Sequence, residues 1–217
     1  MSFNEIFHLY IYSVTGDFNV LEILFYPLSG FFMKISDDMH DKKNNMFLGI
    51  LAGILCGLFL GYLVTVSLDA AYIFFGVFIG TFLAKKINCI NHIVTAIIFL
   101  IIVYLLGFPA IGIGTLAICS IAAYIDEIGN DNKRIYEKSK ILKTFFEYRF
   151  TLKTAILILA IFGILQSFYP AFKIYGIYFL GIQTFIYFLM FEISYEIAGS
   201  KFDAIYNRVY SLFESPE

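Results

Sequence analysis

The chain has 217 residues, of which 60% are hydrophobic and 15% are charged, and its formal net charge is −2. This composition is too apolar for a soluble globular domain. The sequence contains no P-loop, no Cys/His zinc spacing, no nucleophile-elbow motif and no nucleic-acid-binding motif. We therefore expect an all-α integral membrane protein with no nucleic-acid partner.

The first 17 residues precede the long apolar segments and lack the features of a removable signal peptide. Phe3, Phe7, Tyr10 and Val14 recur at helical spacing. We expect residues 1–17 to form an amphipathic segment at the membrane interface, with a frayed terminus as the alternative.

Uncharged runs predict about seven transmembrane helices from there on. A helix needs roughly 20 apolar residues to cross the hydrocarbon core. The run from Lys86 to Asp126 is long enough for two crossings, with Gly107-Phe108-Pro109 as the turn between them. The expected spans are residues 18–35, 47–67, 70–86, 91–106, 109–126, 153–169 and 174–197, followed by a cytoplasmic tail over 200–217.

The basic residues predict the orientation of these spans. All Lys and Arg residues except Lys173 fall at the same side of the alternating spans. By the positive-inside rule this side is cytoplasmic, which places the N-terminus outside and the C-terminus inside. We therefore expect a multi-pass protein of the cell membrane, with membrane lipids as its surroundings.

The order of the segments suggests an internal duplication. Tyr26-Pro27 and Phe108-Pro109 each open a helix that ends in acidic residues, and two further apolar helices follow each of these. The expected transmembrane bundle covers residues 18–199. It would comprise one three-helix repeat over about 18–88, a connecting helix over 90–107 and a second repeat over about 108–203. Because equivalent helices are four apart, the repeats would be parallel, with equivalent loops on one membrane face.

The second expected helix carries glycines at an unbroken four-residue spacing, namely Gly49, Gly53, Gly57 and Gly61. Small residues at this spacing allow close approach of another helix. We expect packing within the chain, and the same stripe makes a homo-oligomer through this helix an alternative. The cysteines Cys56, Cys89 and Cys119 lie in or beside apolar runs and are expected to be small buried hydrophobes rather than a disulfide framework.

Two acidic clusters carry the functional expectation. One follows the first span and the other follows the fifth, so both should lie on the cytoplasmic side. If the first helix continues through its cluster, Asp37, Asp41 and Asn45 share a face. Clustered carboxylates repel one another unless a cation neutralises them, and hard oxygen ligands suit Mg²⁺ bridging to phosphate oxygens. The alternative is a set of solvated acids at helix ends. The expected Mg²⁺ ligands are Asp37, Asp38, Asp41, Asp126, Glu127 and Asp131.

Basic side chains on the same side could stabilise a leaving pyrophosphate. The candidates for this catalytic role are Lys86, Arg149 and Lys201. Glu192 is expected to face the bundle interior, either as a proton acceptor or cation ligand or as an ion-pair partner of Arg149 or Lys153. His92 is expected to be a residue at the membrane boundary.

The acidic motifs resemble those of the UbiA-type intramembrane prenyltransferases. Asp37-Asp38-x-x-Asp41-x-x-x-Asn45 is similar to their N-D-x-x-D-x-x-x-D motif, with Asp and Asn in place of the outer Asn and Asp. Glu127-x-x-x-Asp131 is similar to their D-x-x-x-D motif, with Glu at its first position, and Asp126-x-x-x-Asn130 is an alternative match. Family members are usually longer and have more crossings. The resemblance implies Mg²⁺ and a prenyl diphosphate, with Asp38, Asp41, Glu127 and Asp131 as ligands.

The leading hypothesis is a membrane-embedded Mg²⁺-dependent prenyltransferase that acts on an isoprenoid diphosphate at the cytoplasmic face. A second hypothesis is a small transporter or channel for divalent cations or protons, with a carboxylate-lined path. A third is a structural membrane protein without a site. A transporter needs polar groups along its whole path, and the outer halves of these helices are almost wholly apolar apart from Glu22, Asp69 and Gln183. This difference favours an enzyme that opens to one side.

Overall fold

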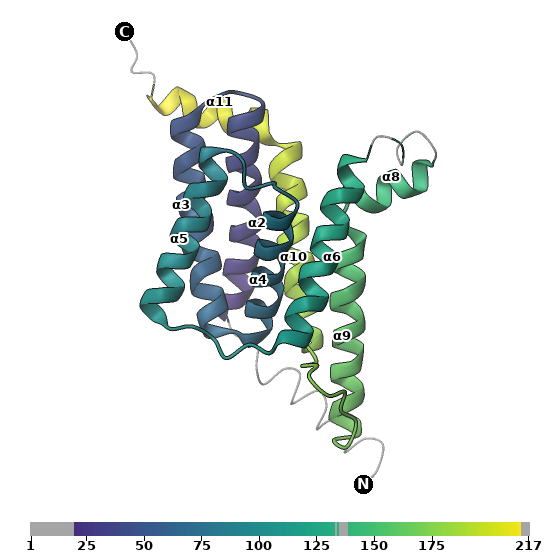
Figure 1. Ribbon diagram of the computed structural model, residues 1–217. Helices are drawn as coiled ribbons and strands as arrows, with labels where there is room; N and C mark the ends of the chain where they lie inside the picture. Colours follow the sequence, from purple (N-terminus) through teal and green to yellow (C-terminus); the bar gives the residue numbers. More distant parts are fainter. Residues whose placement is uncertain (1–19, 133, 135–138, 214–217) are drawn as a thin grey trace.

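The computed structural model describes residues 20–132, 134 and 139–213, and all regular structure in this part of the chain is α-helical. The expected all-α class is therefore confirmed for these residues, whereas the expectation for residues 1–17 lies outside them. The described helices are α2 (Val20–Asp41), α3 (Met46–Val66), α4 (Leu68–Leu83), α5 (Ile90–Leu106), α6 (Ile113–Asp131), α8 (Lys140–Glu147), α9 (Phe150–Phe168), α10 (Ile182–Ser200) and α11 (Phe202–Phe213) (Figure 1).

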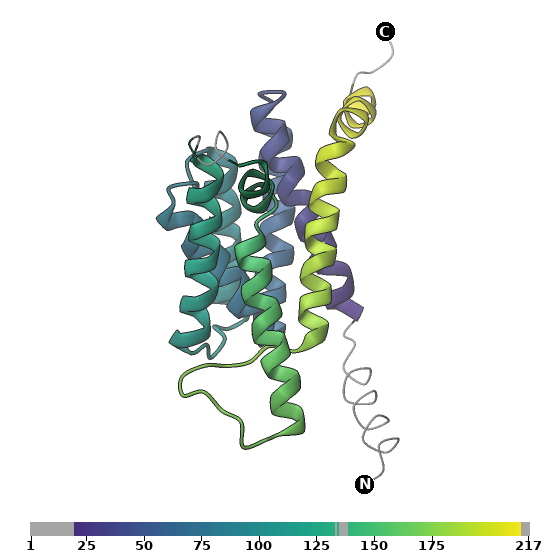
Figure 2. The same ribbon diagram turned by 90° about the vertical axis from the view of Figure 1, so that its right-hand side faces the viewer.

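The long helices run side by side in alternating directions, and α8 and α11 lie across one end of the bundle (Figure 1). We call this end, which carries Asp41, Lys86, Asp131 and Arg149, the polar end. Residues 140–147, which fall between two expected spans, and residues 202–213, which fall in the expected tail, both form helices that the sequence analysis did not predict. Figure 2 shows α11 crossing the polar end beyond α10.

Six helices pack in a closed circuit. Helix α2 packs on α3, α3 on α4, α4 on α6, α6 on α9, α9 on α10, and α10 returns to α2. Large side chains such as Tyr26, Phe74, Phe188 and Phe191 fill the space inside the circuit and are almost fully buried. Helix α5 lies outside the circuit against α3, at the left of Figure 1.

The glycine stripe of α3 forms the contact with α5. A Cβ added to Gly49 would lie 2.2 Å from Asn91 Nδ2, and one added to Gly57 would lie 2.7 Å from the carbonyl oxygen of Thr95. Gly61 approaches Ile102 in the same way. The stripe is therefore covered within the chain. A homo-oligomer through this helix remains a prediction and would have to use another of its faces.

Helices α2 and α6 continue through their acidic clusters and end at Asp41 and Asp131. Asp37 and Asp41 are therefore one helical turn apart on one face of α2. Asn45 leaves that face because it caps the next helix, where its Oδ1 accepts a hydrogen bond from the Leu48 N–H at 3.1 Å. The expectation that Asn45 would share the face of Asp37 depended on a longer helix and is wrong.

The last long helix begins later than expected, at Ile182 rather than near residue 174. Gly176 has a φ of 76°, which a helix does not accommodate. The non-helical backbone that follows is satisfied by other elements. Thr115 Oγ1 exchanges hydrogen bonds with the N–H and C=O of Tyr178 at 2.7 and 2.8 Å, and the Gly181 N–H donates to Asp69 at 2.7 Å.

The outer surface of the bundle is rich in large apolar side chains. Leu105, Ile113, Ile158, Ile161 and Ile186 are all exposed. Among the described helices, Met46–Val66 and Phe150–Phe168 are long and apolar enough to cross a membrane by length and composition, and Leu68–Leu83 and Ile90–Leu106 are shorter apolar helices.

Candidate active site

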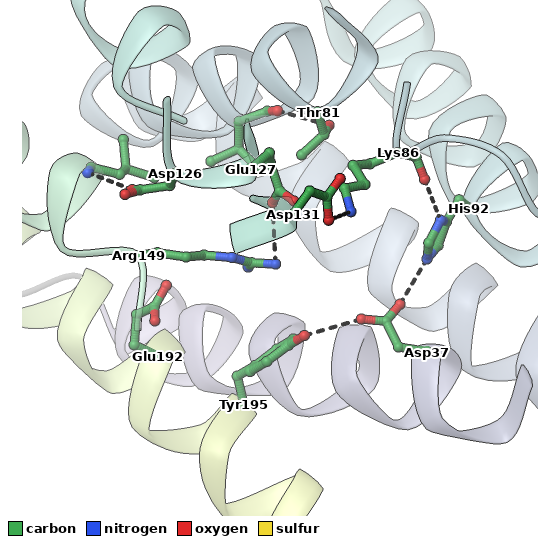
Figure 3. Close-up of polar contacts among 12 residues, drawn as sticks. Asp37, Thr81, Lys86, His92, Asp126, Glu127, Asp131, Arg149, Glu192 and Tyr195 are labelled. Atoms are coloured by element: carbon green, nitrogen blue, oxygen red, sulfur yellow. Dashed lines mark hydrogen bonds and ion pairs between the residues drawn. The ribbon is translucent and has the colours of Figure 1, made fainter. Parts of the chain in front are cut away.

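A pocket of about 280 Å³ opens at the polar end between α2, α3, α4, α5 and α6. Its mouth carries side chains from both acid-bearing helices and from the segments that precede α5 and α9. The polar and charged residues at this mouth are Asp37, Asp41, Lys86, His92, Glu127, Asn130 and Arg149. Figure 3 shows most of these side chains converging from opposite walls.

The rest of the lining is mainly apolar, with Ser36, Thr81 and Thr95 as its polar members. Met33, Leu60, Phe74, Phe78 and Phe99 line the pocket below the charged mouth. Leu60 is 14 residues beyond Met46, the first residue of α3, which corresponds to roughly 20 Å of helix at about 1.5 Å per residue. The aromatic rings of Phe78 and Phe99 are in contact, with centroids 5.8 Å apart. The pocket therefore combines a charged mouth with a mainly apolar lining further in.

On one side of the mouth, Asp37 holds two side chains. Its Oδ1 lies 2.8 Å from His92 Nε2, and its Oδ2 accepts a hydrogen bond from the Tyr195 hydroxyl at 3.1 Å (Figure 3). His92 Nδ1 lies 2.8 Å from the carbonyl oxygen of Lys86. Both ring nitrogens thus face acceptors when Asp37 is ionised, which is the arrangement of a protonated imidazolium.

On the opposite side, Arg149 reaches from the start of α9 to Glu127. Its Nη2 lies 3.3 Å from Glu127 Oε1, and its guanidinium lies 5.4 Å from the ring centroid of Tyr195. Arg149 has a φ of 51°, in the left-handed region that non-glycine residues seldom adopt. Burial by itself would lower the pKa of Arg149, but Tyr195 and Glu127 outweigh it and raise the pKa, so this cation stays charged.

The third cation at the mouth, Lys86, forms an ion pair with Asp131 at the end of α6. Lys86 follows α4, and its carbonyl oxygen is the partner of His92. The contacts therefore run from Asp131 through Lys86, His92 and Asp37 to Tyr195 (Figure 3).

Asp38 and Asp126, by contrast, have structural roles away from the mouth. Asp38 is buried and bound by Lys34 at 3.1 Å and Lys42 at 2.8 Å. Asp126 is also buried, and its two oxygens accept the N–H groups of Thr151 and Leu152 at 3.0 and 2.8 Å, which caps the start of α9.

Lys201 and Glu192 also lie outside the mouth. Lys201 is exposed at the junction of α10 and α11 and is not among the described residues that line the pocket. Glu192 pairs with Lys153 at 2.8 Å, with both side chains largely buried. This contact corresponds to the ion-pair alternative for Glu192.

The six carboxylates expected to bind Mg²⁺ do not form one cluster. In the described part of the chain, no three His, Cys, Asp or Glu side chains are arranged to hold a metal ion. Asp37 and Glu127 are engaged by His92 and Arg149, whereas Asp41 is exposed at the pocket wall. Mg²⁺ commonly takes only one or two carboxylates and completes its shell with water and substrate phosphate oxygens. The donors present therefore fit an ion shared with a bound phosphate, rather than a preformed centre.

Sequence reasoning missed His92 at the mouth and Tyr195, which reaches the mouth through Asp37. His92 was expected to be a boundary residue, and Tyr195 was not considered. The two side chains belong to helices about 100 positions apart in the sequence, and they meet only through Asp37. No local spacing could have linked them, although a histidine in the first turn of a helix, shortly after Lys85-Lys86, was a weak signal.

Comparisons with family models, with curated proteins and with solved structures find no match for this chain.

Proposed function

We propose that this chain is a membrane-embedded enzyme of prenyltransferase type that binds a prenyl diphosphate at the cytoplasmic face. The observation that carries the proposal is the pocket itself, which has charged groups at its mouth and a mainly apolar lining further in, reaching Leu60 about 14 residues along α3. An isoprenoid diphosphate has the same division between an anionic head and a hydrocarbon tail. The resemblance of the acidic motifs to UbiA-type enzymes points in the same direction.

The proposal includes seven membrane crossings, made by α2, α3, α4, α5, α6, α9 and α10. The exposed apolar side chains on these helices support it, because a soluble protein would leave far fewer of them in contact with water. Among the described residues, every Lys and Arg except Lys173 belongs to the half of a helix or to a connection at the polar end, which supports a cytoplasmic position for this end.

The proposal also includes two parallel three-helix repeats joined by α5. One comprises α2, α3 and α4, and the other comprises α6, α9 and α10. The closed circuit of helix contacts supports this arrangement. When α2, α3 and α4 are exchanged with α6, α9 and α10, each contact of the circuit is replaced by another contact of the circuit. This is the behaviour expected of two repeats related by an axis along the membrane normal.

In the proposed reaction, the bond between the prenyl C1 and the diphosphate oxygen breaks, and the electron pair leaves with pyrophosphate. The acceptor atom then bonds to C1 and releases a proton. Arg149, Lys86 and His92 would stabilise the charge that develops on the leaving group. Phe74, Phe78 and Phe99 line the part of the pocket in which the prenyl chain would lie, and their π faces would favour positive charge on it.

The charge balance of the mouth is the reason to keep Mg²⁺ in the proposal. Lys86, His92 and Arg149 are offset by the carboxylates of the same mouth. A phosphate group adds about two negative charges, which these cations alone would leave uncompensated. Mg²⁺, when bound, would supply the missing positive charge, held by Asp41 and by the diphosphate oxygens.

The apolar interior also separates the proposed enzyme from the transporter hypothesis. The pocket opens at the polar end, and Leu60, Phe74 and Phe99 line its apolar part. Beyond them the core is filled by buried side chains such as Val64, Ile73 and Val103. A hydrated ion would meet hydrocarbon there, so this arrangement favours a site that is open to one side.

The test is release of pyrophosphate from geranylgeranyl diphosphate by purified protein with Mg²⁺ and a panel of lipidic and aromatic acceptors. Arg149→Gln should lower the rate on the order of 100-fold because it removes a cation from the leaving group. Lys85→Gln is the matched control, since Lys85 is exposed at the same end and does not line the pocket. The proposal fails if no acceptor supports release, or if both variants lower the rate equally.

A further inference from the structure

Outside the proposed active site, helix α8 presents an apolar face that is only partly covered. On one side, Phe146 packs against Gly129 of α6, where an added Cβ would lie 2.2 Å from Phe146 Cδ1. On the other side, the Ile141 side chain is 81% exposed, and Phe145 is partly exposed. These two residues are four apart and therefore share one side of the helix. The contact with α6 thus fixes α8 in place and leaves half of its apolar face open.

A groove of about 430 Å³ lies along this open side. It is lined by Lys140, Ile141, Thr144, Phe145 and Phe150. It lies at the polar end, where α8 projects beside the ends of α6 and α9 (Figure 1). The groove does not share a residue with the lining of the pocket described above, so the two are separate features.

The groove continues into an exposed row on α9. Phe150, Thr154, Ile158 and Ile161 follow helical spacing and are all exposed. Ile161 is 11 residues beyond Phe150, which corresponds to roughly 16 Å along the helix. This length is about half of a hydrocarbon core of roughly 30 Å, which is the depth of one leaflet.

The charge at the start of α8 is positive. Lys140 and Lys143 lie on its first turns, and its one acidic residue, Glu147, stands at the opposite end of the helix. A basic cluster at this level attracts anionic phospholipid headgroups by about 1 kcal/mol per Lys or Arg. An apolar row one leaflet deep below a basic cluster matches a phospholipid with its headgroup at α8 and an acyl chain along α9.

We propose that α8 and the exposed row of α9 form a binding site for one anionic phospholipid of the cytoplasmic leaflet. The lysines select the charge of the headgroup, and the groove with its continuation on α9 holds an acyl chain. This site is independent of the proposed prenyltransferase activity. It concerns how the chain is held in the membrane, and it stands if the enzymatic proposal fails.

The experiment is native mass spectrometry of the purified full chain in detergent, titrated with dioleoyl phosphatidylglycerol or dioleoyl phosphatidylcholine. Phosphatidylglycerol, which is anionic, should bind more tightly than phosphatidylcholine, which has no net charge. Neutralising both lysines, as Lys140→Gln with Lys143→Gln, should weaken phosphatidylglycerol binding roughly 30-fold, which corresponds to about 1 kcal/mol per charge. Ile141→Ser should weaken binding of both lipids, because it removes apolar contact without changing charge.

The matched control is Lys85→Gln with Arg208→Gln, which removes two charges from the same end but away from α8. This control should retain the wild-type affinity for phosphatidylglycerol. A soluble headgroup without acyl chains, glycerophosphoglycerol, should not compete. The proposal is overturned if both double variants lose affinity equally, if the two lipids bind alike, or if the soluble headgroup displaces the lipid. Unchanged thermal unfolding of each variant shows that lost binding does not come from misfolding.

Discussion

The two acidic clusters of this chain, on α2 and on α6, show the same division between a carboxylate at the pocket and a carboxylate with a structural role. In each, one carboxylate faces the pocket and its neighbour in sequence supports the fold. On α2, Asp37 contacts His92 and Tyr195, whereas Asp38 is bound by Lys34 and Lys42.

On α6, Glu127 contacts Arg149, whereas Asp126 caps the start of α9. Adjacent residues on a helix point in different directions. Each acidic residue in such a run therefore has its own surroundings and role, and the run does not act as one cluster of metal ligands.

The largest expected effect is on stability and concerns Asp126. Asp126→Ala should lower the free energy of unfolding by about 3 kcal/mol, because two buried N–H groups at the start of α9 lose their acceptor. Unfolding in mixed micelles with increasing SDS measures this change. Asp126→Asn, which keeps one acceptor oxygen, should lose less. If Asp126→Ala costs no more than Glu127→Gln, the structural role assigned to Asp126 is wrong.

Substitution of the neighbouring Glu127 should lower the reaction rate and leave the stability nearly unchanged. Glu127→Gln should lower the rate of prenyl transfer on the order of 10- to 100-fold, because Arg149 loses the anion that positions it. Its stability should change little, since the Arg149 side chain is 30% exposed and keeps its contact with Tyr195. The rate and the unfolding curve of the same preparation test both statements. A large loss of stability with an unchanged rate would contradict them.

On α2, Asp38→Asn should produce a moderate effect on stability alone. The carboxylate is buried between two lysines that reach it from one turn before and one turn after. Its neutralisation should cost about 1 kcal/mol, because each lysine head can turn toward water. The rate of prenyl transfer per folded molecule should stay at the wild-type value, and a large fall in that rate would show that Asp38 takes part in the site.

The smallest effect concerns an exposed acid outside both clusters. A hydrogen bond from Lys43 and its charge lower the pKa of Asp203. A carboxyl with a lowered pKa stabilises the fold above the pKa of the unfolded chain, about 3.9, and that contribution is lost as the pH falls through the folded value. Because Asp203 is exposed, Asp203→Asn should change the acid dependence of the thermal midpoint only slightly. A large change would mean that α11 is held mainly by this ion pair.

Much of the fold could be predicted from the sequence because it depends on local features. Uncharged runs marked the long helices, and the glycine spacing on α3 marked a helix contact. The late start of α10 could not be predicted, because it depends on Thr115 and Asp69, distant residues that satisfy the non-helical backbone. The sequence also could not predict that Asp37 and Glu127 face the pocket whereas their neighbours Asp38 and Asp126 have structural roles. This difference depends on which way each helix is rotated against its neighbours.

The most direct test of the account is calorimetric titration of the purified protein with geranylgeranyl diphosphate in the presence of Mg²⁺. Wild type should bind one molecule. Asp37→Asn and Glu127→Gln should each weaken binding on the order of 10-fold, because each releases the cation, His92 or Arg149, that its carboxylate holds at the mouth. Asp38→Asn should bind like wild type. Binding that is insensitive to both pocket variants, or equally sensitive to Asp38→Asn, would contradict a shared site between the two acid-bearing helices.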